Sequence, residues 1–468
     1  MPTLSAGGAA TITLPIGATV TFSPGGNGVV VFGPGQMANN TVGVGTGQST
    51  FGPYQYAQTL YVSASSPVTY SVSGVTTGPQ LTGSTGALRG SIECASNIFA
   101  VSKYGSGGGT QNRTWQCITD AWGAFNAVQP VFINPTASTA TVENCTIAAS
   151  ANSTNAIVPT GAWSAATGAL TVPAGSAANP GYLVAPKIPL KSIPRDDGGS
   201  FPLLYCRTFF QTGNTTYAFG SGGSSFAAAN WGPRSEGHTL IGANVAGDAV
   251  TTPGSWTSGS FDANPIFVPA GFIFTYDQAM TSVAAIGDSI MAGDFGTTTS
   301  GAPYAFKAVT RLSAAGMNVS WINCGFSGQT MVNINARGRA VIDNFAPDIV
   351  IIPAYTINSA VSTQSDWDSQ WYYAMDLAQY QLKKGRRVLF VTPYPNNGLS
   401  AVTDGYRQTQ RQRVINSGIP YADIEGVASD GGYPAKWQSG LNFDATHPND
   451  LGHNALAPVV RAALLQII

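Results

Sequence analysis

The sequence has little charge, which excludes several classes of protein. Only 9% of its 468 residues are Asp, Glu, Lys or Arg, against about 25% in an average globular protein. Hydrophobic residues make up 43%, whereas disordered chains combine high charge with few apolar residues. The formal net charge of -1 provides no broad basic surface for nucleic acid or an anionic membrane. We therefore expect a folded protein that binds neither.

Long apolar runs and metal-binding patterns are lacking too. No run is long enough to span a bilayer, and the first residues lack the basic and apolar stretches of a secretory signal. The five cysteines are widely spaced and contain no C-x-x-C pair. They predict neither a zinc site nor a disulfide framework, although one pair can form on exposure to air. These absences predict a soluble chain without an export signal.

The chain is too long for one hydrophobic core, and its first part favours strands. Residues 1–80 contain short β-branched runs, such as 10–14, 19–22 and 29–32, separated by turns rich in Gly and Pro. Residues 81–278 continue this pattern with longer loops. We predict two all-β modules: a small one at 1–80, and a β-sandwich or jelly-roll-like domain at 81–278.

After Met280 the pattern changes to strands that alternate with helices. The strand-like runs are residues 282–286, 319–322, 348–352, 387–391 and 421–424. The helix-like segments are residues 303–315, a segment capped by Ser365 that stops at Gly385, residues 404–417, and a final segment interrupted by Pro458. This alternation predicts a parallel sheet with helices on both faces, a three-layer α/β/α domain at 279–468. Ligands of such sheets bind beyond the carboxyl ends of the strands.

A serine stands at that edge, in Gly287-Asp288-Ser289-Ile290 directly after the first strand. A serine hydroxyl is inert at neutral pH unless a base takes its proton, and the base needs a partner that fixes its tautomer. Asp444 and His447, three residues apart near the C-terminus, supply both. Since the chain has only three histidines, few bases are available. We predict Ser289 as nucleophile, His447 as base and Asp444 as the group that orients it.

The segment 287–290 resembles the first sequence block of the SGNH (GDSL) hydrolases, and residues 444–447 resemble their closing D-x-x-H block. Residues 325–330, Gly-Phe-Ser-Gly-Gln-Thr, match the second block. The third block, G-x-N-D, is represented by residues 356–359, which keep Asn358 but place Thr356 at the glycine and Ser359 at the aspartate. The blocks occur in the order found in that family.

The resemblance implies an ester hydrolase with an acyl-serine intermediate, without a metal or another cofactor. It also implies an oxyanion hole made of the backbone N–H groups of Ser289 and Gly328 and the side-chain amide of Asn358. Such donors stabilise the negative charge that acyl transfer builds on the carbonyl oxygen. The altered third block leaves a second interpretation open: a structural or receptor-binding protein that keeps an SGNH fold without turnover.

The front modules are similar to those of phage tail fibres and tailspikes, which implies a virion protein released by lysis. In that setting the N-terminal module contacts other virion proteins, and the substrate is an O-acetyl group on a bacterial surface polysaccharide. No hydrophobic lid or long apolar surface helix is evident, which disfavours a lipase. A homotrimer suits a tail fibre, but no repeat or coiled-coil heptad in the sequence requires one.

Overall fold

The computed structural model describes residues 113–134, 137–151, 169–176, 179–196, 201–210, 243–246, 248, 269–293 and 302–468, and the strand residues named below in 1–105 and 218–219.

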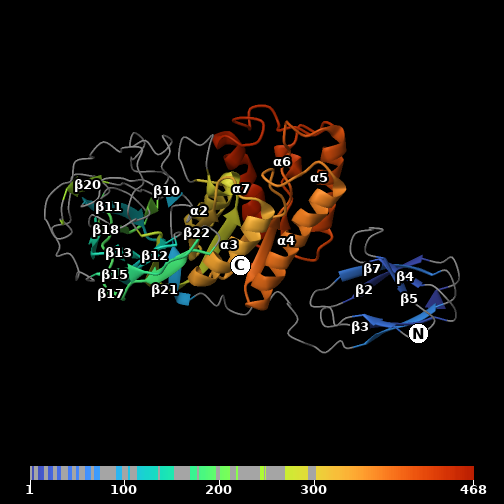
Figure 1. Ribbon diagram of the computed structural model, residues 1–468, viewed down its shortest axis with the longest axis horizontal. Helices are drawn as coiled ribbons and strands as arrows, with labels where there is room; N and C mark the ends of the chain where they lie inside the picture. Colours follow the sequence, from blue (N-terminus) through green and yellow to red (C-terminus); the bar gives the residue numbers. More distant parts are fainter. Residues whose placement is uncertain are drawn as a thin grey trace.

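The described part of residues 1–80 consists of strands (Figure 1). They are β1 (Thr3–Leu4), β2 (Ala9–Leu14), β3 (Thr19–Pro24), β4 (Val29–Phe32), β5 (Thr41–Val44), β6 (Ser49–Phe51), β7 (Gln58–Ala64) and β8 (Val68–Ser73). They form two antiparallel four-stranded sheets, in the orders β1-β8-β3-β6 and β2-β7-β4-β5. The predicted runs at 10–14, 19–22 and 29–32 lie within β2, β3 and β4. A separate small module at 1–80 stays a prediction.

Between residues 81 and 270 the described residues again contain strands as their only regular elements. These are β9 (Ser91–Ser96), β10 (Tyr104–Gly105), β11 (Arg113–Asp120), β12 (Phe125–Asn134), β13 (Ala140–Val142), β14 (Asn144–Ser150), β15 (Leu170–Val172), β16 (Gly181–Val184), β17 (Ile188–Pro189), β18 (Leu203–Phe210), β19 (Ala218–Phe219) and β20 (Ala243–Ala246). One antiparallel sheet has the order β14-β18-β11-β20, and β12 pairs with β16 and β17. The sandwich or jelly-roll arrangement stays a prediction.

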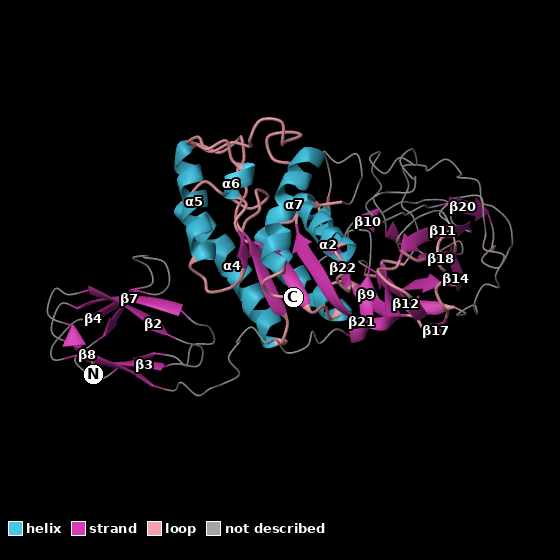
Figure 2. Cartoon of the chain, turned by 180° about the vertical axis from the view of Figure 1, so that it is seen from behind, coloured by secondary structure: helices cyan, strands magenta, loops and turns pink. Residues whose placement is uncertain are grey.

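A single long strand, β21 (Gly271–Gly287), joins the β-rich part to the C-terminal part (Figure 2). Its first half pairs antiparallel with β9 and β12. Its second half pairs in parallel with β22 (Val319–Gly325) and β23 (Ile349–Pro353). The predicted division between residues 278 and 279 falls within this strand, so one continuous backbone connects the two sheet regions.

The C-terminal part has the expected α/β/α layers. Its parallel sheet has the order β22-β21-β23-β24-β25, where β24 is Arg387–Val391 and β25 is Tyr421–Ala422. The helices are α1 (Ser289–Ala292), α2 (Tyr304–Ala314), α3 (Met331–Phe345), α4 (Gln364–Lys383), α5 (Ala401–Ile415), α6 (Glu425–Ala428) and α7 (Asp450–Leu464).

Alternate residues of the central strands belong to two different cores, because successive side chains of a strand point to opposite faces. Val283 and Ile351 belong to the core that includes α2 and α7. Ala284 and Val350 belong to the core that includes α3 and α4. Both faces of the sheet are therefore buried.

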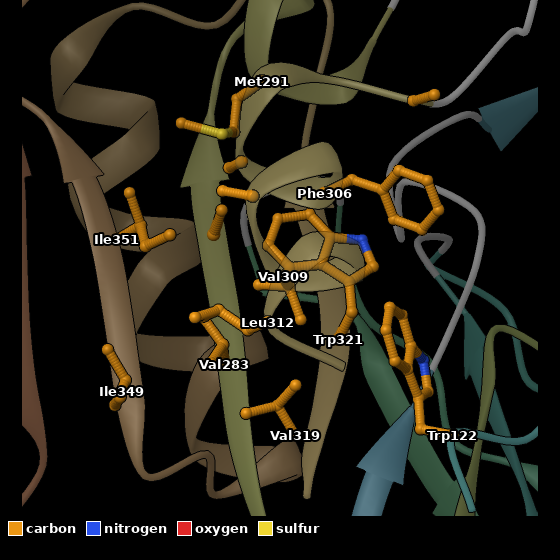
Figure 3. Packing of buried hydrophobic residues seen from close by; sticks show 14 of the residues in the cluster. Trp122, Val283, Met291, Phe306, Val309, Leu312, Val319, Trp321, Ile349 and Ile351 are labelled. Carbon is orange, nitrogen blue, oxygen red and sulfur yellow. The ribbon is translucent and has the colours of Figure 1, made fainter. Parts of the chain in front are cut away.

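The first of these cores extends into the β-rich part (Figure 3). Trp122 lies in the loop between β11 and β12, and its ring centroid is 6.1 Å from that of Phe306 on α2. The ring centroids of Phe306 and of Trp321 on β22 are 6.2 Å apart. The α/β layers and the neighbouring β strands thus share one apolar core.

The cap of α4 differs from the prediction. Its N-cap is Thr363, not Ser365, because the Thr363 side chain accepts from the backbone N–H of Asp366 while the Asp366 carboxylate accepts from that of Thr363. This reciprocal capping box satisfies two backbone donors at once, whereas Ser365 lies exposed within the first turn. The cap prediction was therefore wrong by two residues.

The final helix also differs, since Pro458 lies inside α7 and does not interrupt it. A proline within a helix leaves the carbonyl four residues earlier without its usual donor. Here that carbonyl belongs to Asn454, and the Arg311 guanidinium of α2 lies 3.5 Å from it and donates to it. A contact between two helices replaces the missing backbone hydrogen bond.

Candidate active site

The candidate nucleophile stands at the carboxyl edge of the parallel sheet. Ser289 is the first residue of α1, directly after β21, and is 6% exposed. The helix begins there because the Asp288 side chain caps it by accepting from the backbone N–H of Ile290, at 3.0 Å. Gly287 has no side chain to collide with Met291, whose Cβ lies 2.6 Å from the position of a Cβ on Gly287. The sharp turn from strand to helix thus depends on this local sequence.

The structure brings Ser289, His447 and Asp444 together in the predicted order. The Oγ of Ser289 lies 2.9 Å from Nε2 of His447, and Nδ1 of His447 lies 2.8 Å from Oδ2 of Asp444. Partial burial raises the pKa of Asp444, but hydrogen bonds from the His447 backbone and ring outweigh it and hold that pKa below its usual value. An ionised Asp444 accepts a hydrogen bond from the N–H at Nδ1, which leaves the lone pair of Nε2 facing Ser289.

The histidine loop is held by its own backbone and by the loop after β24. The Oδ1 of Asp444 accepts from the backbone N–H groups of Thr446 and His447, both at 2.7 Å. The backbone N–H of Asn397 donates to the carbonyl of Ala445 at 2.9 Å. The imidazole is therefore oriented before any substrate arrives.

The second block packs directly against the nucleophile helix. Its Phe326 N–H donates to the Gly287 carbonyl at 2.9 Å, which ties this loop to the end of β21. Gly328, the predicted oxyanion residue, has φ of +75°, a left-handed conformation that favours glycine. The structure thus places the second block beside the first at the carboxyl edge.

The third block is joined to both other loops through the two residues that depart from the family pattern. The Thr356 hydroxyl donates to Oδ2 of Asp288 at 2.6 Å. The Ser359 hydroxyl accepts from the backbone N–H of Met331, the first residue of α3, at 2.9 Å. Asn358, the predicted oxyanion donor, is exposed, and its side-chain amide lies 3.2 Å from the Thr356 hydroxyl and 3.3 Å from the Gln329 carbonyl.

Asp288 is a buried carboxyl group that the sequence did not assign beyond its block. Burial raises its pKa, while hydrogen bonds from Thr356, Tyr394 and Ile290 oppose that rise in part. The Tyr394 hydroxyl donates to Oδ2 of Asp288 at 3.0 Å. Sequence reasoning missed Tyr394, although its place three residues after a predicted strand put it at the same edge of the sheet.

His453, the other histidine of the C-terminal part, supports a helix instead of the triad. Its Nδ1 accepts from the backbone N–H of Tyr304 at 3.1 Å and so caps α2, whose own N-cap residue, Pro303, makes no side-chain hydrogen bond. His453 is fully buried, and burial lowers its pKa to about 3. It is therefore neutral near pH 7.

Within the described residues, no group of three or more His, Cys, Asp or Glu side chains has an arrangement suited to a metal ion. No helix in the part of the chain that the structure describes is long and apolar enough to cross a membrane.

The parallel α/β/α sheet of the C-terminal part, with Ser289 and His447 side by side at its carboxyl edge, is the arrangement of a GDSL-type acylhydrolase fold. Residues 285–455 match the GDSL-like Lipase/Acylhydrolase family. The resemblance noted in the sequence is thus confirmed for this region, at the level of a carboxylic ester hydrolase. A search of curated proteins gives no match. The likeness of the front modules to tail fibres stays a prediction.

Several solved structures are similar to this chain over the same part. A GDSL-like lipase from Bacteroides thetaiotaomicron is 16% identical, with 40% of this chain and 89% of that chain covered and a TM-score of 0.32. An α/β hydrolase from the metagenome of Lake Arreo, Spain, is 21% identical, with 40% and 96% covered and a TM-score of 0.31. An acetylxylan esterase from Geobacillus stearothermophilus is 23% identical, with 39% and 94% covered and a TM-score of 0.31.

Proposed function

We propose that this protein hydrolyses carboxylic esters through an acyl-serine intermediate. The observation that carries the proposal is the hydrogen-bonded chain from Ser289 through His447 to Asp444, at 2.9 and 2.8 Å. Both distances are within the range over which a proton passes between a nucleophile and its base.

In the proposed reaction, Nε2 of His447 takes the hydroxyl proton as Oγ of Ser289 attacks the ester carbonyl. Asp444 stabilises the resulting imidazolium without taking its proton. The negative charge on the former carbonyl oxygen is stabilised by the backbone N–H groups of Ser289 and Gly328 and by the Asn358 amide. His447 then protonates the leaving alcohol, and it later activates the water that releases the acid.

The substrate that we propose is an O-acetyl group on a bacterial surface polysaccharide. An acyl group carried on a polymer requires an open site. The exposure of the candidate active site supports the proposal, since Gly328 and Asn358 are exposed and the side chain of Asp444 is 43% exposed. We further propose that the chain is part of a phage tail fibre or tailspike, as a trimer attached through the N-terminal module. The Gly- and Thr-rich, strand-forming composition of residues 1–278 supports the tail-fibre assignment.

A second candidate is a receptor-binding virion protein that binds the same polysaccharide without cleaving it. The altered third block favours it, because Thr356 and Ser359 stand where the family pattern has glycine and aspartate.

The experiment compares the parent protein with Ser289→Ala and with Ser365→Ala, an exposed serine on α4, as matched control. Acetate release is measured from p-nitrophenyl acetate and from an O-acetylated bacterial polysaccharide. We expect release by the parent and by Ser365→Ala, and none above background by Ser289→Ala. If the parent is inactive, or Ser289→Ala keeps full activity, the esterase proposal fails. Polysaccharide binding without acetate release supports the second candidate.

A further inference from the structure

The side chain of Thr356 links the carboxyl group next to the nucleophile with the predicted oxyanion amide. Its Oγ1 lies 2.6 Å from Oδ2 of Asp288 and 3.2 Å from Nδ2 of Asn358. It also accepts from the backbone N–H of Asn358 at 3.3 Å. Thr356 is fully buried, whereas Asn358 is exposed.

A hydroxyl has one proton, and the distances indicate where it goes. Carboxylate acceptors form the shorter and stronger bonds, and Asp288 is nearer to the Thr356 hydroxyl, at 2.6 Å, than the Gln329 carbonyl, at 3.2 Å. With its proton donated to Asp288, the hydroxyl presents its lone pairs to Asn358. Asp288 cannot swing away, because Tyr394 and the backbone of Ile290 also donate to it.

A glycine at this position has no atom that performs this task. Among the residues that the structure describes, the Asn358 amide then keeps one acceptor, the Gln329 carbonyl at 3.3 Å. The terminal torsion of an asparagine is broad, so an exposed amide with one long hydrogen bond samples several orientations. An oxyanion donor contributes most when its direction is fixed before the charge develops.

We propose that Thr356 is a positioning residue for the oxyanion hole. Its hydroxyl donates to Asp288, the residue before the nucleophile, and accepts from the Asn358 amide, and so fixes the direction of that amide relative to Ser289. The inference rests on the proposed esterase function. Thr356 itself contacts no reacting atom, and its effect passes through Asn358.

The first test removes the hydroxyl at nearly constant shape with Thr356→Val and keeps it with Thr356→Ser. Steady-state kinetics are measured with p-nitrophenyl acetate. We expect Thr356→Val to lower kcat about tenfold with KM within about twofold, because an oxyanion contact forms in the transition state more than in the ground state. Thr356→Ser should recover kcat to within about threefold of the parent.

The second test is a double-mutant cycle with Asn358→Ala. Asn358→Ala should lower kcat by about 10² or more. If Thr356 acts through Asn358, adding Thr356→Val to that variant changes kcat by less than about twofold, because residues that act as a unit are not additive.

Ser282→Ala is the matched control. The Ser282 hydroxyl is also buried and donates to a carboxylate, Asp348, at 2.9 Å, but it lies near the opposite end of the parallel segment of β21. It should keep the parent kcat, and melting temperatures measured on all variants show whether each is folded.

The inference is overturned if Thr356→Val keeps the parent kcat, if its effect multiplies with that of Asn358→Ala, or if Ser282→Ala loses kcat equally. In each of these cases the Ser289-dependent activity of the parent still stands. An inactive parent overturns the esterase proposal instead.

Discussion

Gly325 of the second block lies against Ala292 of the nucleophile helix so closely that a Cβ on the glycine would be 2.3 Å from the backbone nitrogen of Ala292. The obstacle is backbone, which cannot rotate away as a flexible side chain does. The space between the end of β22 and α1 therefore has no room for any side chain at residue 325.

Gly325→Ala should displace α1 and lower the free energy of unfolding by about 1 to 3 kcal/mol or more, as overpacked cores do. Urea unfolding measures the loss. Gly426→Ala, on α6, is the control because nothing lies within 4 Å of its added Cβ, and its effect should stay within about 0.5 kcal/mol. Equal stability of Gly325→Ala and the parent would show that α1 does not pack as described.

Asp444→Asn should lower kcat by about 10². An amide donates to Nδ1 of His447 and stabilises the wrong tautomer, which costs about 10⁴ at a buried triad and less at this exposed one. Asp430→Asn is the control, since Asp430 also accepts backbone hydrogen bonds in a loop, from Gly432 and Lys436, at 2.9 and 3.0 Å. Steady-state kinetics measure both variants, and an unchanged kcat in Asp444→Asn would remove Asp444 from the mechanism.

The buried His453 predicts acid lability. The folded chain keeps it neutral, with a pKa near 3, whereas the unfolded chain binds a proton below the ordinary value of 6.5. The unfolded state therefore holds more protons between these values, so this group's contribution to stability falls as pH falls from 6.5 toward 3. The free energy of unfolding changes by about 1.4 kcal/mol for each pH unit over the range in which the unfolded state binds one proton more than the folded state.

The test compares urea unfolding at pH 7 and pH 5 for the parent and for His453→Asn, which keeps an acceptor for the N–H of Tyr304. The parent should lose more stability between the two pH values than His453→Asn does. An identical loss in both proteins would show that His453 is not the buried titrating group.

Thr363→Ala should lower the free energy of unfolding by about 1 kcal/mol, the usual cost of losing an N-cap. Ser365→Ala, the cap that the sequence suggested, should change it by less than about 0.5 kcal/mol because this side chain is exposed. Chemical denaturation of the two variants distinguishes them. The reverse ranking would restore Ser365 as the cap.

Local sequence was sufficient for most elements of the C-terminal part. The predicted run at 387–391 coincides with β24, and residues 404–417 overlap α5. The sequence did not predict α3, because polar residues interrupt its apolar spacing and its cap at Thr330 belongs to the second block. The capping box of Thr363 and Asp366 can be recognised in the sequence, and it was missed because Ser365, two residues later, is also a residue type that caps helices.

The amino-acid sequence by itself determined the α/β class of the C-terminal part and the order of its blocks, and it predicted the roles of Ser289, His447 and Asp444. Strand periodicity and short-range spacing are local properties, and parallel strands necessarily bring their carboxyl ends to one edge. Only the tertiary structure decided the partners of the altered third block. Thr356 and Asp288 are 68 residues apart, and no local pattern encodes a hydrogen bond between side chains that meet only when two strands lie side by side.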